Sequence, residues 1–270
     1  MPIIRHRETG ASLTDVMPGG DLRRALLAYA DLNGADVRGA NLRQADLCNA
    51  DLRGAHFDAA TLTGADATLC DSAGSFFGRA LLDDARLQGM NKRHQGVVAI
   101  DFSGADLTRA TLKNSNLNGT RFTNAILRRA DLTRCNLSGA DLSGADLTDA
   151  SLASGNLSGA TMRYASLVGA VLTGANLEGA DLDGADLTLA TLNGVRLADA
   201  DVSETLWSKT VIARAAGLHE ARGLDRLRFG DPSAIDMHTL RASIANLPNG
   251  LLQHCGISES DIDALRRLLV

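Results

Sequence analysis

The side chains of this chain that could do chemistry are six histidines, four cysteines and many carboxylates. The histidines are not spaced as an HExxH pair or as another metal-binding pair, and the cysteines lack the CxxC spacing of zinc and redox sites. The nearest approach to a catalytic set is His238, His254 and Cys255, which could converge near the C-terminus. We therefore expect neither a bound metal nor a cofactor.

Carboxylate pairs such as Asp141 and Asp146 are abundant, but an acid–base pair needs a cleft and an apolar pocket that separates the two pKa values. Here the carboxylates follow a five-residue repeat that predicts a convex, solvated surface. The phosphate-binding loops GxxxxGK[ST] and GxGxxG are absent from the sequence. These observations predict a protein that is not an enzyme.

The composition limits the classes of binding partner and the cellular compartment that we expect. The chain has 27 Lys+Arg against 32 Asp+Glu and a net charge of -5, so we expect no direct binding of nucleic acid. No apolar run reaches the roughly 18 residues that span a bilayer, and no apolar stretch follows the first basic residues, so we expect neither secretion by a classical signal nor membrane insertion. The widely spaced cysteines are typical of free thiols, and we expect a cytoplasmic protein.

The chain repeats itself every five residues. From position 22 to position 202, 34 of 37 sites hold Leu, Val, Phe or Met, and the site two residues earlier is Ala at 26 of 37 positions. One large and one small apolar side chain per pentad point inward, and three residues remain for water and a corner. A glycine two residues after the leucine, as at Gly34 and Gly184, suits a corner with positive φ. Four pentads therefore close a square coil.

Residues that lie 20 apart should stack in such a coil, and several of them repeat in type. These are the pairs Phe57 with Phe77 and Phe102 with Phe122, and the row Asn116, Asn136, Asn156 and Asn176. Aromatic and asparagine ladders of this kind stabilise stacked coils. About nine coils at roughly 4.8 Å each predict a rod on the order of 45 Å long.

The A-(D/N)-L-x-x pattern resembles the pentapeptide-repeat family, and the resemblance covers residues 20–205. It implies an all-β solenoid, a right-handed quadrilateral β-helix of about nine coils. Members that confer resistance to quinolones or peptide toxins resemble a DNA duplex and engage DNA gyrase or topoisomerase IV. The resemblance thus implies a bacterial, DNA-mimicking protein-interaction rod linked to antibiotic resistance. Such members often form a homodimer through a C-terminal helix.

Two stretches break the repeat. Residues 67–75 place Ala and Ser in the leucine column, which predicts a thinner wall and a bulged or distorted coil. Residues 88–96 place Lys92 in that column, with Arg93 and His94 beside it, and an unpaired buried cation is costly. We expect this pentad to leave the coil as an exposed basic loop. The loop is either a partner-binding element or a tolerated spacer.

Charge is uneven along the repeat, because residues 136–205 carry 10 acidic groups against 2 basic ones. Carboxylates in the same 20-residue register should form rows on adjacent faces of the rod. The two predicted rows are Asp141, Asp181 and Asp201, and Asp146 and Asp186. The rows either imitate the phosphate backbone for a DNA-binding protein or are only solvated residues that suit the coil.

The pattern changes after residue 205. Trp207, the only tryptophan, is still in the leucine phase and is predicted to plug the last coil, because an open solenoid end must be covered. Asp231 and Pro232 predict the start of a helix that ends before Pro248. Ser258, with an acidic residue three positions on, predicts the cap of a final helix. The apolar stripe of that helix, Ile262, Leu265 and Leu269, either packs internally or forms a dimer seam.

Residues 231–258 resemble the linker module that follows pentapeptide repeats in some bacterial multi-domain proteins, where an effector domain comes next. This resemblance implies a second function, as the targeting or sensor arm of a multi-domain effector or signalling protein. We expect three segments. They are an N-terminal cap or tail over residues 1–19, a β-helix over 20–205 with a loop at 88–96, and a helical cap or docking module over 206–270.

Overall fold

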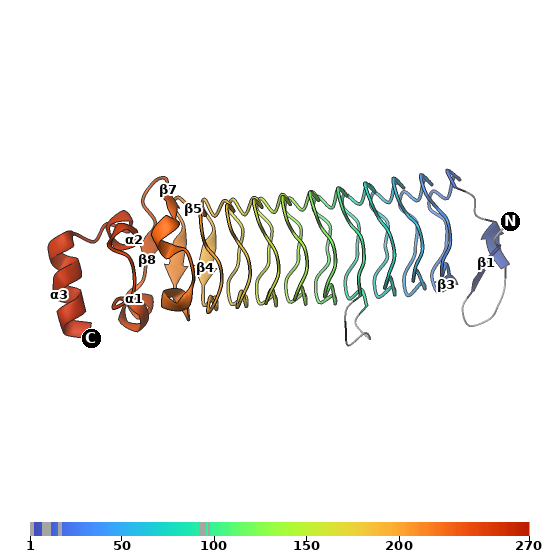
Figure 1. The fold of residues 1–270 in the computed structure, drawn as a ribbon. Coiled ribbons are helices and arrows are strands. Elements are labelled where there is room, and N and C mark those ends of the chain that lie inside the picture. The colour runs from blue at the N-terminus through green and yellow to red at the C-terminus, as the bar shows by residue number, and fades with distance from the viewer. Residues whose placement is uncertain (1–2, 7–11, 16–17, 92–95, 97, 270) are drawn as a thin grey trace.

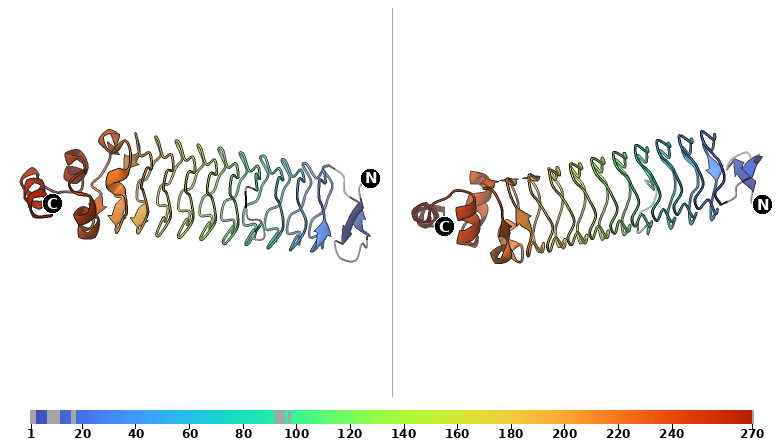
Figure 2. Two further views of the ribbon diagram at one scale, coloured as in Figure 1. Left: turned by 60° about the horizontal axis from the view of Figure 1, so that its bottom comes forward. Right: turned by 90° about the horizontal axis from the view of Figure 1, so that it is seen from above.

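The computed structural model describes residues 3–6, 12–15, 18–91, 96 and 98–269, and the chain forms a long rod of stacked coils (Figure 1). An N-terminal hairpin lies at one end of the rod and the C-terminal helices lie at the other (Figure 2). Four ladders of parallel bridges run along the rod, and most of their residues pair with the residue 20 positions on, as Asp21 does with Asn41. The fold is a β-helix solenoid.

The four ladders define four faces, which we name A to D by the residue at which each ladder starts. The ladder of face A starts at Asp21, that of face B at Leu26, that of face C at Asp31 and that of face D at Asp36. Consecutive pentads occupy consecutive faces, so faces D and A are neighbours. In each pentad the first residue, whose number ends in 1 or 6, lies on the face. The third and fourth residues form the corner that leads to the next face.

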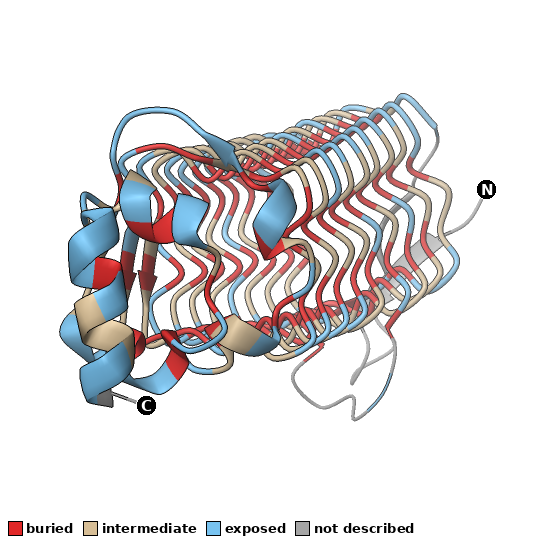
Figure 3. Cartoon of the chain, turned by 60° about the vertical axis from the view of Figure 1, so that its left-hand side comes forward, coloured by how far each residue is buried: buried red, intermediate tan, exposed pale blue. Residues whose placement is uncertain are grey.

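The second and fifth residues of each pentad point into the coil and form its core. Leu52 and Ala55, for example, are 1% and 0% exposed. Such residues form buried rows along the inside of the rod (Figure 3). The fourth residue has a positive φ both at Gly34 (65°) and at Arg24 (55°). The corner therefore imposes this conformation, and glycine only adopts it with less strain.

Between residues 21 and 200 the repeat changes register once, between Asn91 and Val98. On three faces the ladder spacing rises from 20 to 25 residues, as between Phe76 and Asp101, so the chain carries five more residues here than in the other coils. Val98 and Ile100 are buried and supply inward side chains at this point. Four residues of the predicted basic loop over 88–96 lie outside the described residues, namely Lys92, Arg93, His94 and Gln95.

The register change joins two phenylalanine pairs into one stack. The ring centroids are 4.7 Å apart between Phe57 and Phe77 and 5.3 Å apart between Phe102 and Phe122. Between them, Phe77 also stacks on Phe102, at 4.9 Å. A strict 20-residue spacing does not reveal this third contact, because residues 77 and 102 are 25 apart. All four rings are buried, so the stack forms a continuous part of the core.

The coil at residues 67–75 is regular, so the distortion predicted there is wrong. Its turns repeat those of the neighbouring coils. Ser72 is fully buried in place of a leucine. Asn91 fills the remaining space, because its Oδ1 accepts a hydrogen bond from the Ser72 amide (2.7 Å) and its Nδ2 donates to Ser72 Oγ (3.2 Å). A satisfied polar pair thus replaces apolar packing at this position.

The ladders continue beyond residue 205. Strand β4 (Thr191–Asn193) pairs with β6 (Val211–Ala213), β6 pairs with β8 (Ala234–Ile235), and β5 (Leu206–Trp207) pairs with β7 (Arg228–Phe229). Trp207 is fully buried, and its Nε1 donates to Thr205 Oγ1 (3.0 Å). Because β7 stacks on β5, Trp207 does not close the rod as the sequence predicts. A further coil covers it.

Two short 3₁₀ turns and three helices complete the C-terminal end. They are η1 (Leu218–Glu220), η2 (Leu224–Arg226), α1 (Met237–Ser243), α2 (Asn249–His254) and α3 (Glu259–Leu269). Helix α1 begins after Asp236, whose side chain accepts a hydrogen bond from the Thr239 amide (2.8 Å). The start predicted at Asp231 and Pro232 is therefore wrong, because the last coil, with β8, still follows these residues.

Helix α3 is capped and tied to the rest of the module. Ser258 Oγ accepts a hydrogen bond from the Asp261 amide (3.2 Å) and donates to Asp261 Oδ2 (2.6 Å), as the sequence predicts. Arg266 Nη2 donates to the Leu247 carbonyl (2.7 Å), which links α3 to the segment after α1. Ile262, the first residue of the predicted stripe, is fully buried inside the molecule.

The N-terminal strands β1 (Ile3–His6) and β2 (Ser12–Asp15) form an antiparallel hairpin. Strand β1 also pairs antiparallel with β3 (Ala30–Asp31) in the first coils, which gives a sheet of order β2-β1-β3. This sheet joins the hairpin to the start of the solenoid. Within the described part of the chain, no helix has the length and apolar character needed to cross a membrane.

Candidate functional site

The structure places the two predicted carboxylate rows on neighbouring faces. In ladder order they are Asp141, Thr161, Asp181 and Asp201 on face D, and Asp146, Ser166 and Asp186 on face A. Thr161 lies between Asp141 and Asp181 in one ladder, and Ser166 lies between Asp146 and Asp186 in the other. The corner between faces D and A lies between the two rows, so the rows flank the same edge of the rod.

Each of these carboxylates has a structural task in its own pentad. One carboxylate oxygen accepts a hydrogen bond from the amide two residues on, at 3.0 Å for both Asp141 and Asp201. Hydrogen bonds from Ser203 thereby lower the pKa of Asp201. Asn136 makes the same bond to the Ser138 amide (3.3 Å). Because a neutral amide serves equally well, the coil itself does not require a negative charge at these positions.

Arginines are interleaved with the carboxylates. Arg163 bridges Asp181 (3.3 Å) and Asp183 (2.6 Å), and Arg128 Nε donates to Asp146 (2.5 Å). Ion pairs also join Arg129 with Asp149 and Arg226 with Glu204, whereas Asp141, Asp186 and Asp201 make no ion pair with any described residue. These three carboxylates are therefore not held in a direct ion pair, although Arg121 and Arg222 lie next to Asp141 and Asp201 in their ladder.

The acidic groups of the distal half lie on one side of the rod. Of the ten acidic residues between 136 and 205, eight belong to pentads of faces D and A, two to face C and none to face B. We call these eight residues the acidic side; they are Asp141, Asp146, Asp149, Asp181, Asp183, Asp186, Asp201 and Glu204. This asymmetry arises because the pentads that follow them in sequence, on faces B and C, are mostly neutral.

Faces B and C carry no charge over several coils. The neutral pentads are 116–120, 136–140 and 156–160 on face C, and 151–155, 171–175 and 191–195 on face B. Face C holds the asparagine ladder, in which Asn136 Nδ2 donates to Asn116 Oδ1 (3.1 Å) and Asn156 Nδ2 donates to Asn136 Oδ1 (3.3 Å). The ladder extends to Asn176, whose Nδ2 donates to Asn156 Oδ1 (3.5 Å). Its amides bond to one another and stabilise the stack.

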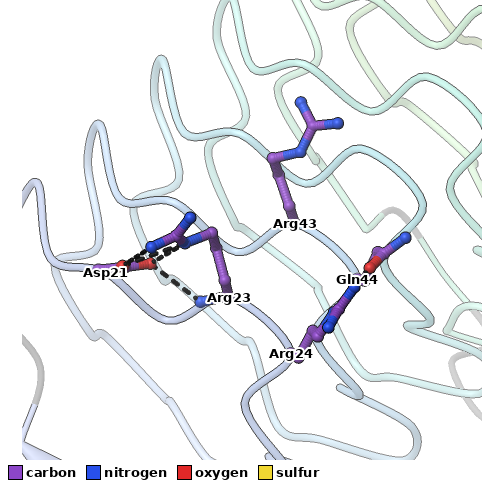
Figure 4. Close-up of a pocket in the computed structure, with 5 residues that line it drawn as sticks. All are labelled: Asp21, Arg23, Arg24, Arg43 and Gln44. Atoms are coloured by element: carbon purple, nitrogen blue, oxygen red, sulfur yellow. Dashed lines mark hydrogen bonds and ion pairs between the residues drawn. The ribbon is translucent and has the colours of Figure 1, made fainter.

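A basic groove that the sequence predictions missed lies near the N-terminal end of face A. It is lined by Asp21, Arg23, Arg24, Arg43 and Gln44 (Figure 4). Arg23 Nη2 donates to Asp21 (2.6 Å) and Arg24 Nε donates to Gln44 (3.0 Å), while the Arg43 guanidinium points away from both pairs. Arginines at corner positions one coil apart are the signal that could have found it.

His254 and Cys255, near the C-terminal end, contact or lie among other residues of the fold. His254 Nε2 lies 3.0 Å from Ser233 Oγ, and the imidazole stacks on Phe229 with ring centroids 4.4 Å apart. Burial raises the pKa of Cys255 to about 11, so this thiol is not ionised at neutral pH. His238 is exposed. Among the described residues, no group of three or more His, Cys, Asp or Glu side chains could hold a metal ion.

A family model described as pentapeptide repeats matches the chain in eight copies, over residues 9–44, 38–71, 100–139, 125–164, 140–179 and 170–206. These ranges together cover more than half of the chain. They stop at residue 71 and resume at residue 100, on either side of the register change. A search among curated proteins found no match.

Several solved structures are similar to the chain. HetL from the cyanobacterium Nostoc sp., a pentapeptide repeat protein involved in heterocyst differentiation regulation, is 31% identical over 76% of this chain and 87% of its own, with a TM-score of 0.43. A pentapeptide repeat protein from the Arabidopsis thaliana thylakoid lumen is 38% identical over 33% of this chain and 61% of its own, with a TM-score of 0.32. QnrB1, a plasmid-mediated fluoroquinolone resistance protein, is 18% identical over 90% and 97%, with a TM-score of 0.37.

Proposed function

The chain belongs to the pentapeptide repeat family, and from this premise we propose that it is a non-catalytic interaction protein that binds a type II topoisomerase in place of DNA. The proposed partner is DNA gyrase or topoisomerase IV, which the protein modulates or protects in the bacterial cytoplasm. The proposed contact surface is the acidic side, on a right-handed quadrilateral rod of about nine coils.

The observation that carries the proposal is the concentration of carboxylates on two adjacent faces. The eight residues of the acidic side lie in three coils of a stretch of four, which spans about 19 Å at roughly 4.8 Å per coil. Four arginines, Arg128, Arg129, Arg163 and Arg226, pair with them and leave a net charge of four. One net charge per about 5 Å is sparser than the one per about 3.4 Å of a single DNA strand. The acidic side therefore produces an electrostatic field of the same sign as that of DNA, but a weaker one.

A protein groove that binds DNA is lined with cations and attracts any rod with such a field. Asp141, Asp186 and Asp201 make no direct ion pair with a described residue, although Arg121 and Arg222 are the ladder neighbours of Asp141 and Asp201. Because these side chains are already held by backbone amides, little conformational entropy is lost when a partner binds them.

The test is gyrase supercoiling at graded protein concentration, with and without a quinolone. The informative variant is the triple change Asp141→Asn, Asp186→Asn and Asp201→Asn. Asparagine keeps the hydrogen bond to the amide two residues on, so the charge is lost while the coil is preserved. Three surface charges at about 0.5 kcal/mol each predict a loss of potency of about tenfold.

A matched control removes three charges from the other two faces. Asp31→Asn, Asp46→Asn and Asp131→Asn also preserve the bonds to the amide two residues on. The proposal predicts that this control inhibits or protects gyrase as the wild type does. Equal loss in both triple variants would show that net charge matters and the acidic side does not. If gyrase ignores the wild type at micromolar excess, the proposal fails, and the role as a targeting arm becomes the alternative.

The basic segment Lys92, Arg93 and His94 is proposed as a second contact with the partner. Deleting residues 92–96 tests it, because Asn91 and residues 97–100 then form one pentad, NVVAI, with apolar residues at both inward positions. A loss of gyrase inhibition in a folded deletion variant supports the contact. Unchanged inhibition identifies the segment as a spacer.

A further inference from the structure

Tyr164 occupies the centre of the acidic side. It is the fourth residue of its pentad and stands at the corner between faces D and A. It is 68% exposed, more than any other Phe, Tyr or Trp of the chain. It is also the only aromatic residue between residues 141 and 205. The ring is therefore not part of the core and is accessible to another molecule.

The surroundings of Tyr164 leave its ring open along the corner. The corner residues of the coils before and after it are Gly144 and Gly184, which have no side chains. The Cδ1–Cε1 edge of the ring lies against Gly184, where an added Cβ would come within 2.5 Å of both atoms. Tyr164 itself has a φ of 56°, a conformation that is strained for a bulky residue. The ring is thus held at the corner by Gly184 at its edge and by the Arg163 guanidinium over it.

The ring lies next to the Arg163 guanidinium and is flanked by carboxylates. Arg163 holds Asp181 and Asp183 beside the corner, and its Cζ lies 5.9 Å from the Tyr164 ring centroid. Asp141, one coil before on face D, and Asp186, one coil after on face A, make no ion pair with any described residue. Arg163 already lies over one face of the ring, and a second cation placed over the other face would be attracted both by the electron-rich ring and by these carboxylates.

Arginine fits this position better than lysine does. Its planar guanidinium stacks on an aromatic face and can still donate paired hydrogen bonds to a carboxylate. Lysine has a compact, strongly hydrated charge that does neither. Tyrosine is also a frequent anchor in protein interfaces, since it offers a large contact area and loses little side-chain entropy.

We propose that Tyr164 is the anchor of the acidic side and stacks against an arginine of a basic protein surface, while Asp141 and Asp186 receive neighbouring cations of that surface. The proposal rests on the proposed function for the identity of the partner, but its chemistry applies to any arginine-rich protein surface. The proposed stacking predicts a preference for arginine over lysine. A uniform row of charges would show no such preference.

The first experiment uses deca-arginine and deca-lysine peptides as probes, with affinities measured by isothermal titration calorimetry at about 0.1 M salt. The wild type should bind deca-arginine about three- to tenfold more tightly than deca-lysine. Tyr164→Ser should abolish this preference and keep the salt-dependent binding of both peptides. Tyr164→Phe should retain the preference, because its ring is intact. Tyr29→Ser, at a corner between faces B and C, is the control and should behave as the wild type.

Circular dichroism establishes that each variant is folded, which is expected because serine already occupies the equivalent corner position at Ser154. The proposal is overturned if Tyr164→Ser keeps the arginine preference, if the wild type shows none, or if deca-arginine does not bind.

A second arm compares wild type and Tyr164→Ser in the gyrase supercoiling assay. A lower potency of the variant supports both proposals, and equal potency overturns the anchor. If the wild type does not affect gyrase while the peptide preference depends on Tyr164, the topoisomerase proposal fails. The anchor then stands for a different arginine-rich partner.

Discussion

Phe77 and Phe102 stack across the register change, and a double-mutant cycle measures that contact. Phe77→Leu and Phe102→Leu each remove a ring but keep a large apolar side chain in the core. Each single change should lower the free energy of unfolding by roughly 1–2 kcal/mol. The ring centroids are 4.9 Å apart with an interplanar angle of 18°. The double variant should therefore lose less than the sum of the single losses, by about 0.5–1.5 kcal/mol.

The assay is guanidinium unfolding followed by far-UV circular dichroism and by the fluorescence of Trp207, the only tryptophan. Coincident transitions from the two probes establish that a single free energy describes the unfolding. The control cycle combines Phe57→Leu with Phe102→Leu, whose rings are separated by the ring of Phe77. These two changes should be additive to within about 0.5 kcal/mol.

The outcome that would refute the reasoning is additivity of Phe77→Leu and Phe102→Leu within the same margin. The rings would then not be in contact, and the five additional residues would have to be accommodated elsewhere in the chain. The cycle thus tests the register of the whole rod, because every coil after residue 101 depends on it.

Three further predictions follow from the same structure. Deleting residues 92–96 restores a 20-residue spacing, so the thermal midpoint should stay within a few degrees of the wild type in a circular dichroism melt; a collapse would contradict the observed register. Asn156→Ala removes ladder bonds to Asn136 and Asn176 and should cost about 1–2 kcal/mol in guanidinium unfolding, and an unchanged midpoint would show that the ladder adds nothing. Burial raises the pKa of Asp141, but hydrogen bonds from Ser143 outweigh it and lower the pKa overall, so its contribution to stability is present above the ordinary pKa of an aspartate and is lost as the pH falls through the lowered pKa. Asp141→Asn should therefore make the fall of the thermal midpoint between pH 5 and pH 2 shallower, and an identical fall would assign the acid sensitivity to other groups.

The candidate site was only partly predictable. The 20-residue period assigns Asp141 and Asp181 to one row and Asp146 to the next, because a ladder position depends on residue number alone. The sequence does not show that Arg163 neutralises part of these rows, since an ion pair depends on which side chains of neighbouring coils reach one another. It also gives no special weight to Tyr164, whose exposure depends on the glycine corners above and below it.

The sequence by itself determined the solenoid, the inward positions of each pentad and the polarity of each face position. A pentad has only two inward positions, and the same two residue types fill them for most of the chain. The apolar positions of each pentad are therefore the positions that the coil buries. Lys92 in the leucine column also locates the interruption of that period, whereas the tertiary structure decided how the coil continues across it and how the end is closed. At the interruption, Asn91 and Val98 continue the coil although five additional residues separate them from a regular register. Beyond Trp207, the solenoid adds another coil before α1 begins. Both outcomes depend on contacts between residues distant in sequence, and a repeat pattern carries no information about contacts that depart from its period.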